Sequence, residues 1–147
     1  MLNDEISELD KKLIAGIDLV KIGYRELSSY LAPGAVPADE LNFNFTVSPQ
    51  NPVNNNRFFR LYLKSVCDGG EGCAITVDVY GEYEIKDEDL RPMSVENAIR
   101  YTNLVAALQL MPYIRESVSS LSAKVFGKTI TMPVIRYGEL EFSEDSC

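Results

Sequence analysis

The chain has 147 residues, of which 46% are hydrophobic and 24% are charged, values that are ordinary for a globular protein and exclude wholesale disorder. Its formal net charge is −8, and it lacks the clusters of Lys and Arg that phosphate backbones require, so we expect no nucleic-acid partner. It contains no histidine, which excludes Ser-His and Cys-His catalysis and removes the commonest metal ligand.

The first residues predict a short amphipathic helix within residues 1–13. Ile6, Leu9 and Leu13 recur at near-helical spacing, with acidic side chains early and lysines late, which suits the helix dipole. This segment does not resemble a secretory signal, and no stretch of the chain is apolar enough to span a membrane. Three cysteines without a dense framework favour a reducing compartment. We therefore expect a cytoplasmic protein that does not insert into membranes.

Residues 14–85 predict four strands, because apolar and polar side chains alternate along them. The predicted strands cover residues 14–30, 41–47, 58–66 and 75–85. A change of parity near Leu19 and Val20 predicts a bulge in the first strand. The glycine-rich turn from Cys67 to Cys73 joins the last two strands as an antiparallel hairpin. We expect a four-stranded antiparallel meander sheet.

Residues 94–127 predict a kinked pair of helices that packs as a long helical layer on one face of the sheet. Ser94 is placed to cap the first helix, and the second helix ends near Gly127. Pro112 lacks a backbone donor, so we expect it at a kink or in the first turn of the second helix. Residues 128–147 are predicted to form an apolar crossover and a short tail. All 147 residues are expected to form one α+β domain.

Two clusters could carry chemistry but do not favour it. Cys67 and Cys73 flank a tight turn and could form a cross-strand bridge, although the geometry is demanding and a reducing compartment favours free thiols. Two thiolates without histidine leave a zinc ion under-coordinated. The carboxylates of Asp87, Glu88 and Asp89 lack the spacing of a calcium loop and are expected in a solvated loop. We expect neither a metal nor a cofactor.

The glycines of the β-turn region and the serines of the second helix are also better explained by structural roles than by chemistry. The glycines before the fourth strand are not followed by the helix and lysine of a phosphate-binding loop, so turn formation explains them better. The serines of the second helix have no plausible base, and small residues on a helix more often indicate close packing. We expect that the chain is not an enzyme.

The apolar stretch Ile130–Tyr137 has two interpretations. It is either a core segment that folds back under the helix or an exposed apolar edge that receives a partner. The residues alone favour the core. The aromatic side chains on strands 41–47 and 58–63 have the same ambiguity.

Three segments resemble the SecB family of bacterial export chaperones. The run Leu110–Leu121, which contains Pro-Tyr-Ile-Arg-Glu-Ser, resembles the family signature of Pro-Tyr-Ala-Arg-Glu followed by a small residue. The crossover Ile130–Val134 resembles an apolar stretch of the family with Ala-Pro-Val. Residues Ala74–Ile85 resemble the family's last strand, which ends in an aromatic, an acidic residue and Ile. The resemblance extends over residues 19–142.

The resemblance implies a SecB-like fold and an ATP-independent holdase that binds unfolded, nascent or preprotein clients through apolar grooves, with protein export as one use. It also implies a homo-oligomer, either a dimer or a tetramer. The implied client-binding residues are Phe43, Phe45, Phe58, Tyr113, Ile130, Met132, Val134 and Tyr137. The implied oligomer interface contains Ser117, Ser120 and Lys124.

The sequence departs from the family at both ends. The family's zinc-binding tail, which contacts the SecA motor, has no counterpart here, so a SecA-like motor stays an open partner. An N-terminal helix is added, and the helix over residues 95–110 is longer than its counterpart. Divergent relatives include chaperones dedicated to one client such as an antitoxin, which is one alternative function. A small-molecule or lipid carrier that uses a cavity between sheet and helix is another.

Overall fold

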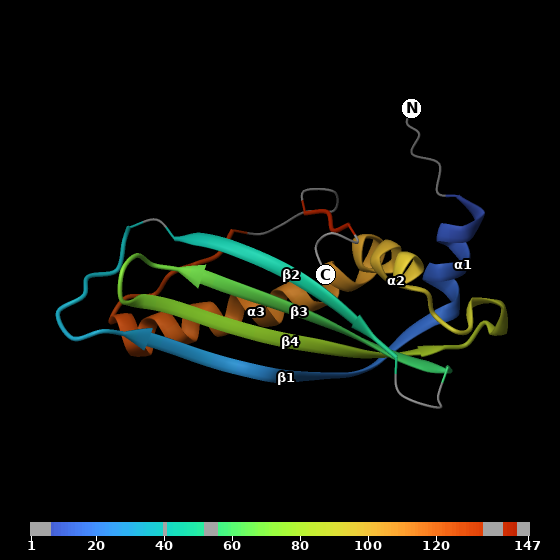
Figure 1. The fold of residues 1–147 in the computed structure, drawn as a ribbon, viewed down its shortest axis with the longest axis horizontal. Coiled ribbons are helices and arrows are strands. Elements are labelled where there is room, and N and C mark those ends of the chain that lie inside the picture. The colour runs from blue at the N-terminus through green and yellow to red at the C-terminus, as the bar shows by residue number, and fades with distance from the viewer. Residues whose placement is uncertain (1–6, 40, 52–55, 134–139, 144–147) are drawn as a thin grey trace.

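The computed structural model describes residues 7–39, 41–51, 56–133 and 140–143. One helix, α1 (Glu8–Gly16), leads into a four-stranded antiparallel sheet, and a long helical run covers one face of the sheet (Figure 1). The strands are β1 (Ile17–Leu31), β2 (Asn42–Gln50), β3 (Phe58–Asp68) and β4 (Cys73–Ile85). The predicted α+β class, with four antiparallel strands and a long helix, is confirmed.

The order of the strands corrects the predicted meander. Only β2, β3 and β4 follow one another in the sheet, and β1 lies beside β4, so the order is β1-β4-β3-β2. After β1 the chain crosses the β3–β4 turn toward the opposite edge. Main-chain hydrogen bonds from the Ala32 N–H to the Gly72 carbonyl and from the Ala38 N–H to the Gly69 carbonyl hold this connection. The strands β1 and β2 are therefore the two edges of the sheet.

The two faces of the sheet have different composition. On β4, alternate side chains from Cys73 to Ile85 face the helical layer and are buried, whereas the others face away and include charged residues. The strand β1 keeps this alternation only with two register shifts. The shift between Leu19 and Lys21 is the predicted bulge, and the shift between Tyr24 and Glu26 was not predicted. Each shift re-aims the apolar side chains of the edge strand.

Aromatic rings fill the centre of the core. Tyr83 of β4 stacks on Phe59 of β3 at 5.3 Å between ring centroids, and Tyr101 of the helical layer meets the Tyr83 ring edge-on at 5.3 Å. A Cβ atom on Gly81 would lie 2.6 Å from the Tyr83 ring, so the ring lies across the glycine. The Tyr83 hydroxyl donates a hydrogen bond to Gln109 Oε1 at 3.0 Å, which satisfies its one buried polar atom.

The helical layer runs without a break from Val95 to Phe126. Its parts are α2 (Val95–Tyr101), the π-helical turn η2 (Thr102–Ala106), α3 (Ala107–Leu121) and a second π-helical turn, η3 (Ser122–Phe126). The Ser94 hydroxyl accepts a hydrogen bond from the Asn97 N–H at 3.0 Å, which confirms the predicted cap. Gly127 has φ of 78° and ends the layer in the left-handed conformation that glycine favours.

Pro112 lies inside α3. Of its two predicted positions, the first turn of a helix is therefore wrong. The change from α2 to α3 is made instead by η2, where the Ala107 N–H bonds to the carbonyl of Thr102, one residue beyond α-helical spacing. The sequence does not show such a turn, because a π-helical turn depends on tertiary packing as well as on local propensity.

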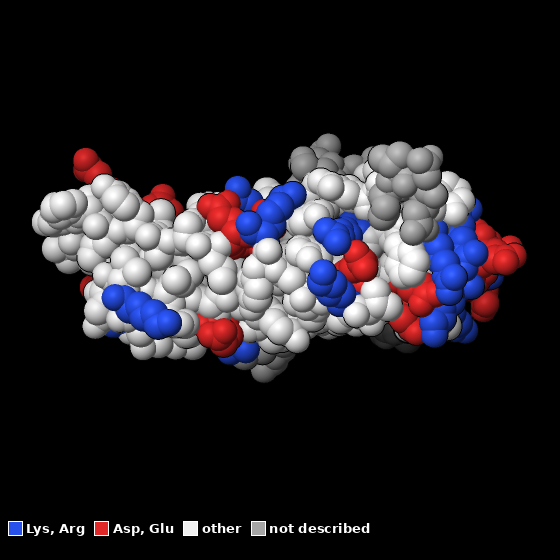
Figure 2. Space-filling view, turned by 90° about the horizontal axis from the view of Figure 1, so that it is seen from below, with Lys and Arg blue, Asp and Glu red and all other residues white. Residues whose placement is uncertain are grey.

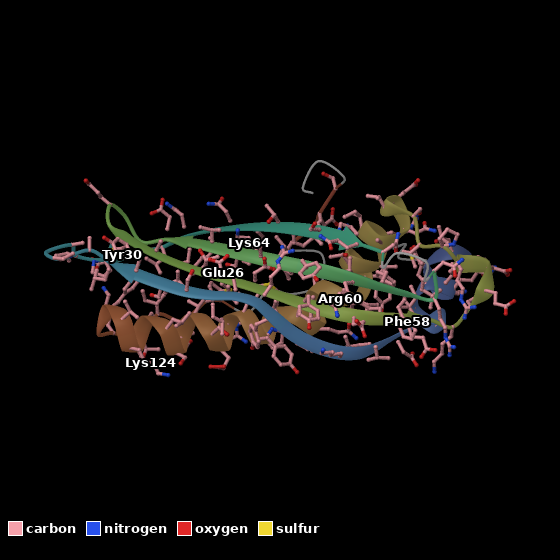
Figure 3. All side chains as sticks on the ribbon, turned by 60° about the horizontal axis from the view of Figure 1, so that its bottom comes forward. Glu26, Tyr30, Phe58, Arg60, Lys64 and Lys124 are labelled. Atoms are coloured by element: carbon pink, nitrogen blue, oxygen red, sulfur yellow. The ribbon has the colours of Figure 1, made fainter. Side chains whose placement is uncertain are left out.

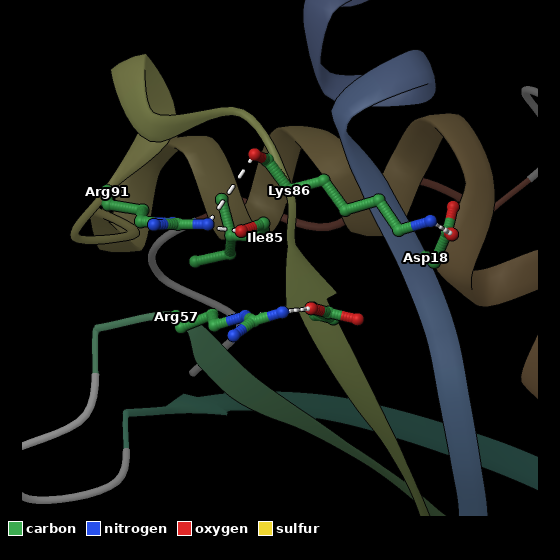
Figure 4. Close-up of polar contacts among 6 residues, drawn as sticks. Asp18, Arg57, Ile85, Lys86 and Arg91 are labelled. Atoms are coloured by element: carbon green, nitrogen blue, oxygen red, sulfur yellow. Dashed lines mark hydrogen bonds and ion pairs between the residues drawn. The ribbon is translucent and has the colours of Figure 1, made fainter.

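Ion pairs fasten the N-terminal helix and the end of β4. The helix α1 begins at Glu8, after residues 1–6 that lie outside the described part, and Asp10 accepts a hydrogen bond from the Arg100 guanidinium at 2.6 Å. Lys86 pairs with Asp18 of β1 at 2.6 Å, and Arg91 donates to the Ile85 carbonyl at 2.9 Å (Figure 4). These contacts hold the chain where it leaves the sheet for the helical layer.

Candidate functional site

The acidic run after β4 is a capped turn. Residues Glu88–Leu90 form a single 3₁₀ turn, η1, and the Asp87 carboxylate accepts a hydrogen bond from the Asp89 N–H at 3.0 Å. Asp89 also pairs with Lys12 of α1 at 3.4 Å. Among the residues that the structure describes, no group of three potential metal-ligating side chains comes together.

The two cysteines of the β3–β4 hairpin are free thiols in the core. Cys67 and Cys73 are both buried, and no bond joins them. Burial, followed by the charge of Asp68, raises the pKa of the Cys67 thiol to about 12. Because the thiolate is the reactive species, Cys67 is a poor nucleophile and packs as a small apolar side chain.

The face of the sheet that points away from the helices carries a network of aromatic and charged side chains (Figure 3). Arg60 pairs with Glu82 at 2.9 Å, and its guanidinium lies 4.6 Å from the centroid of the Tyr80 ring. Arg25 lies 4.0 Å from the Tyr62 ring and pairs with the buried carboxylate of Asp78 at 2.8 Å. Each of the two arginines is thus paired with a carboxylate of β4, whereas the second oxygen of the buried Asp78 carboxylate, Oδ1, has no hydrogen-bond partner among the described residues.

Phe58 lies on this outer face, as the register Phe58 to Glu84 shows (Figure 3). In contrast, Phe43 and Phe45 of β2 lie on the helix side, in line with the fully buried Val47. The structure therefore separates Phe58 from the two other predicted strand residues by the thickness of the sheet. An extended client on the helix side would not contact all three.

The chain after Gly127 turns back along the helical layer, on the side of β2 (Figure 1). We call residues 128–133 and 140–143 the strap. Met132 is 1% exposed and Phe142 is 6% exposed, whereas Ile130 and Leu140 are partly buried against the core. For the described part of Ile130–Tyr137, Ile130 and Met132 thus agree with the core interpretation, while residues 134–137 lie outside the described residues.

Helix side chains hold the first part of the strap by its main chain. The Ile130 N–H donates to Ser122 Oγ at 2.8 Å, and the Ser119 hydroxyl donates to the Ile130 carbonyl at 3.3 Å. Two residues later, Arg115 Nε donates to the Met132 carbonyl at 3.2 Å. Two of the helix serines, Ser119 and Ser122, are therefore strap contacts.

Asn103 holds the second part of the strap in the same way. Its side-chain oxygen accepts a hydrogen bond from the Phe142 N–H at 2.8 Å, and its amide nitrogen donates to the Phe142 carbonyl at 2.9 Å. Asn103 thus binds the main chain of one residue as a neighbouring strand would. We call Asn103, Arg115, Ser119 and Ser122 the strap-binding residues. Arg115 lies in the run that resembles the SecB signature, whereas no pattern in the sequence pointed to Asn103.

The other predicted site residues are spread over the molecule. Tyr113 of α3 is 41% exposed. Val134 and Tyr137 lie outside the described residues. Of the predicted oligomer interface, Lys124 is exposed, Ser120 is partly buried, and Ser117 is buried within the chain itself at 5% exposure.

The edge strand β1 carries an exposed apolar surface that the sequence did not single out. Its exposed apolar side chains are Val20, Tyr24, Leu27 and Tyr30. Tyr24 and Leu27 stand in register with Val79 and Val77 and so point to the helix side of the sheet. Figure 2 looks at the molecule from this edge, and charged side chains crowd the end that carries α1, while the opposite half is largely uncharged.

Among the hollows of the described surface are a larger, charged one beside α1 and a smaller one beside the strap. One, of about 450 Å³, lies between α1 and the end of β4 and is lined mainly by charged side chains of lysine, Asp87 and Glu8. The other, of about 210 Å³, lies between α3 and the strap, beside Arg115, Ser119 and Thr131. Within the described residues, no helix has the length and apolar character needed to cross a membrane.

Comparison with known proteins gives one kind of match. No protein-family model and no curated protein sequence matches the chain. Among solved structures, it is similar to the SecB-like chaperone of Mycobacterium tuberculosis, solved in complex with a ChAD peptide from the HigA1 antitoxin. The sequence identity is 13%, the TM-score is 0.72, and the match covers 88% of this chain and 98% of that chain. The resemblance of residues 19–142 is therefore confirmed at the level of the fold: this chain has a SecB-like fold.

Proposed function

We propose that this chain is an ATP-independent holdase chaperone that binds unfolded or nascent polypeptides. The SecB-like fold carries this proposal, because the solved neighbour is a chaperone in complex with a peptide from another protein. The absence of histidine from the sequence and the paired state of the described acidic run give no support to a catalytic alternative. The proposal places the protein in the cytoplasm.

The helix side of β2 is the first part of the proposed client surface. Phe43 and Phe45 are only partly buried there, at an edge of the sheet. An extended client can bury apolar side chains against them and pair its main chain with an edge strand. Ile130 and Met132 of the strap mark the second part, although Met132 is 1% exposed and is accessible only when the strap moves. Tyr113 is a third, separate contact.

We also place self-association in this proposal, at β1. The strand has 15 residues and lies at the edge of the sheet, with Leu27 50% exposed and Tyr30 59% exposed. A long apolar edge strand invites pairing with another chain, and proteins usually blunt or cover such an edge. A second copy that pairs its own β1 antiparallel to this one would cover both. Lys124 and Ser120 then belong to the proposed contact more readily than the buried Ser117.

A chaperone dedicated to one client is the second candidate function. It is favoured by the solved neighbour, whose bound peptide comes from an antitoxin. Protein export with a SecA-like motor is supported by the resemblance of the Leu110–Leu121 run alone. The carrier alternative has less support, because the 450 Å³ hollow is lined mainly by charged side chains.

The proposal is tested by suppression of aggregation with two unrelated unfolding proteins. Wild-type protein is expected to keep both in solution without ATP. Phe45→Ser is expected to weaken the suppression about tenfold. Burial of a Phe side chain contributes about 1.5–3 kcal/mol, and loss of the lower value corresponds to about a tenfold weaker affinity. Asn44→Ser, on the same strand but the opposite face, is the matched control and should behave as wild type.

Protection of neither protein would overturn general holding. Protection of one antitoxin-like client alone would support the dedicated chaperone. Equal activity of Phe45→Ser and wild type would remove β2 from the client surface.

A further inference from the structure

The hydrogen bonds that hold the strap do not depend on its sequence. They join main-chain groups of Ile130, Met132 and Phe142 to side chains of the helical layer. Any residue except proline offers the same N–H and carbonyl groups. The strap-binding residues therefore recognise an extended main chain as such.

The distance between the contacts along the helix matches the distance between their partners along an extended chain. Ser119 and Arg115 are four residues apart on α3, a rise of about 6 Å along a helix. Their partners, the carbonyls of Ile130 and Met132, are two residues apart, about 6.6 Å along an extended chain. The two spacings agree, so successive turns of α3 contact alternate carbonyls of a segment that runs antiparallel to the helix.

Two buried apolar side chains of the strap, which we call its anchors, determine which sequences fit the surface beneath it. Met132 and Phe142 are almost completely buried, at 1% and 6% exposure. Both anchors bind the core through apolar burial, which is non-directional and accepts other large apolar side chains. The surface under the strap thus fits an extended polypeptide with large apolar residues among its alternate positions.

We infer that the strap is a built-in ligand of the surface beneath it and that a client polypeptide displaces it to bind the same strap-binding residues. This inference rests on the proposed holdase function and adds how the client is recognised and what competes with it. Asn103, Arg115, Ser119 and Ser122 bind whichever extended chain is present. The apparent affinity for a client is the intrinsic affinity multiplied by the fraction of molecules whose strap is detached, so the bound strap lowers it.

Phe142→Ser tests the competition, because it weakens the strap and leaves the surface beneath it unchanged. The affinity for a fluorescent, permanently unfolded polypeptide is measured by anisotropy. Loss of a buried Phe anchor is expected to raise this affinity by at least about tenfold. Glu141→Gln, at the exposed neighbouring position, is the matched control and should bind as wild type.

The double variant Asn103→Ala, Phe142→Ser separates two causes of a gain in affinity: client binding at the residues that the strap leaves free, and a general loosening of the protein. Asn103 makes both hydrogen bonds to Phe142 in the present structure and would make the equivalent bonds to a client. The double variant is therefore expected to lose several-fold of the affinity gained by Phe142→Ser. A gain that is independent of Asn103 would overturn its assignment as a binding residue.

A peptide of residues 128–143 provides a second measurement on the unaltered chain, should Phe142→Ser not fold. The peptide is expected to displace the bound polypeptide from wild-type protein, whereas the same peptide with Ser in place of Phe142 is not. Client binding that is equal in wild type and Phe142→Ser, or is indifferent to the peptide, overturns the competition and leaves the holdase proposal intact. No client binding by any variant overturns the holdase proposal itself.

Discussion

Tyr83 brings a titratable group into the most buried layer of the molecule. It is 0% exposed, and burial, followed by the effect of Tyr101, raises the pKa of its phenol. In the unfolded chain a tyrosine ionises near pH 10, so above that pH the unfolded state binds fewer protons than the folded state. The free energy of unfolding must therefore fall as the pH rises above about 10.

Phe in place of Tyr83 is expected to separate this effect from packing. At pH 7 the Tyr83→Phe variant should be about 1 kcal/mol less stable, because the hydrogen bond to Gln109 is lost. At pH 11 the difference should shrink, since phenylalanine has no proton to retain. Urea unfolding at both pH values measures the two differences. Stability curves that stay parallel from pH 7 to pH 11 would show that Tyr83 ionises normally in the folded protein.

Single residues also mark the limit of what the sequence can predict. The missing histidine, the capping role of Ser94 and the exposure of Glu88 and Asp89 follow from residue type and local spacing. The strap contacts do not, because Asn103 binds Phe142 across 39 positions of the chain. Such a pairing exists only once the strap has folded back along the helical layer.

The sequence predicts an element well where hydrophobic periodicity defines it. It predicts the arrangement of elements poorly where the path of a connection decides it. Alternation gave all four strands and the bulge at Leu19, since one buried face imposes a period of two. Alternation could not identify the neighbour of β1, because it assigns side chains to the faces of a sheet and not strands to their neighbours. The connection after β1, held by Gly69 and Gly72 of the β3–β4 turn, decides that order. The placement of Pro112 in the first turn of a helix was wrong for a related reason: the π-helical turn that precedes α3 has no local signature in the sequence.

The edge strand β1 leads to a prediction at this scale. Leu27→Lys places a charge on the exposed edge and is expected to weaken self-association at least about tenfold, because burying a charge in a new interface is costly. The free energy of unfolding of the monomer should change by no more than about 0.5 kcal/mol, as is usual for surface positions. Analytical ultracentrifugation gives the association constant.

Val36→Lys is the matched control, since Val36 is a fully apolar and more exposed residue in the connection after β1. Unchanged association of Leu27→Lys, or equal loss in Val36→Lys, would move the subunit contact away from β1.

On the scale of the whole molecule, the fold leaves three apolar regions at the surface of one sheet and its helical layer. One is the β1 edge, the second is the helix side of β2 around Phe45, and the third is covered by the chain's own strap. A protein that holds other chains can use the first region for its own copy and the other two for clients.

The mass of the protein in solution, measured by light scattering with and without an excess of a permanently unfolded polypeptide, tests this account most directly. We predict an oligomer of defined mass that gains the mass of bound polypeptide when the unfolded chain is added. The gain should be larger for Phe142→Ser than for wild type at the same sub-saturating concentration. A monomer whose mass does not change on addition of the unfolded chain would contradict the holdase function.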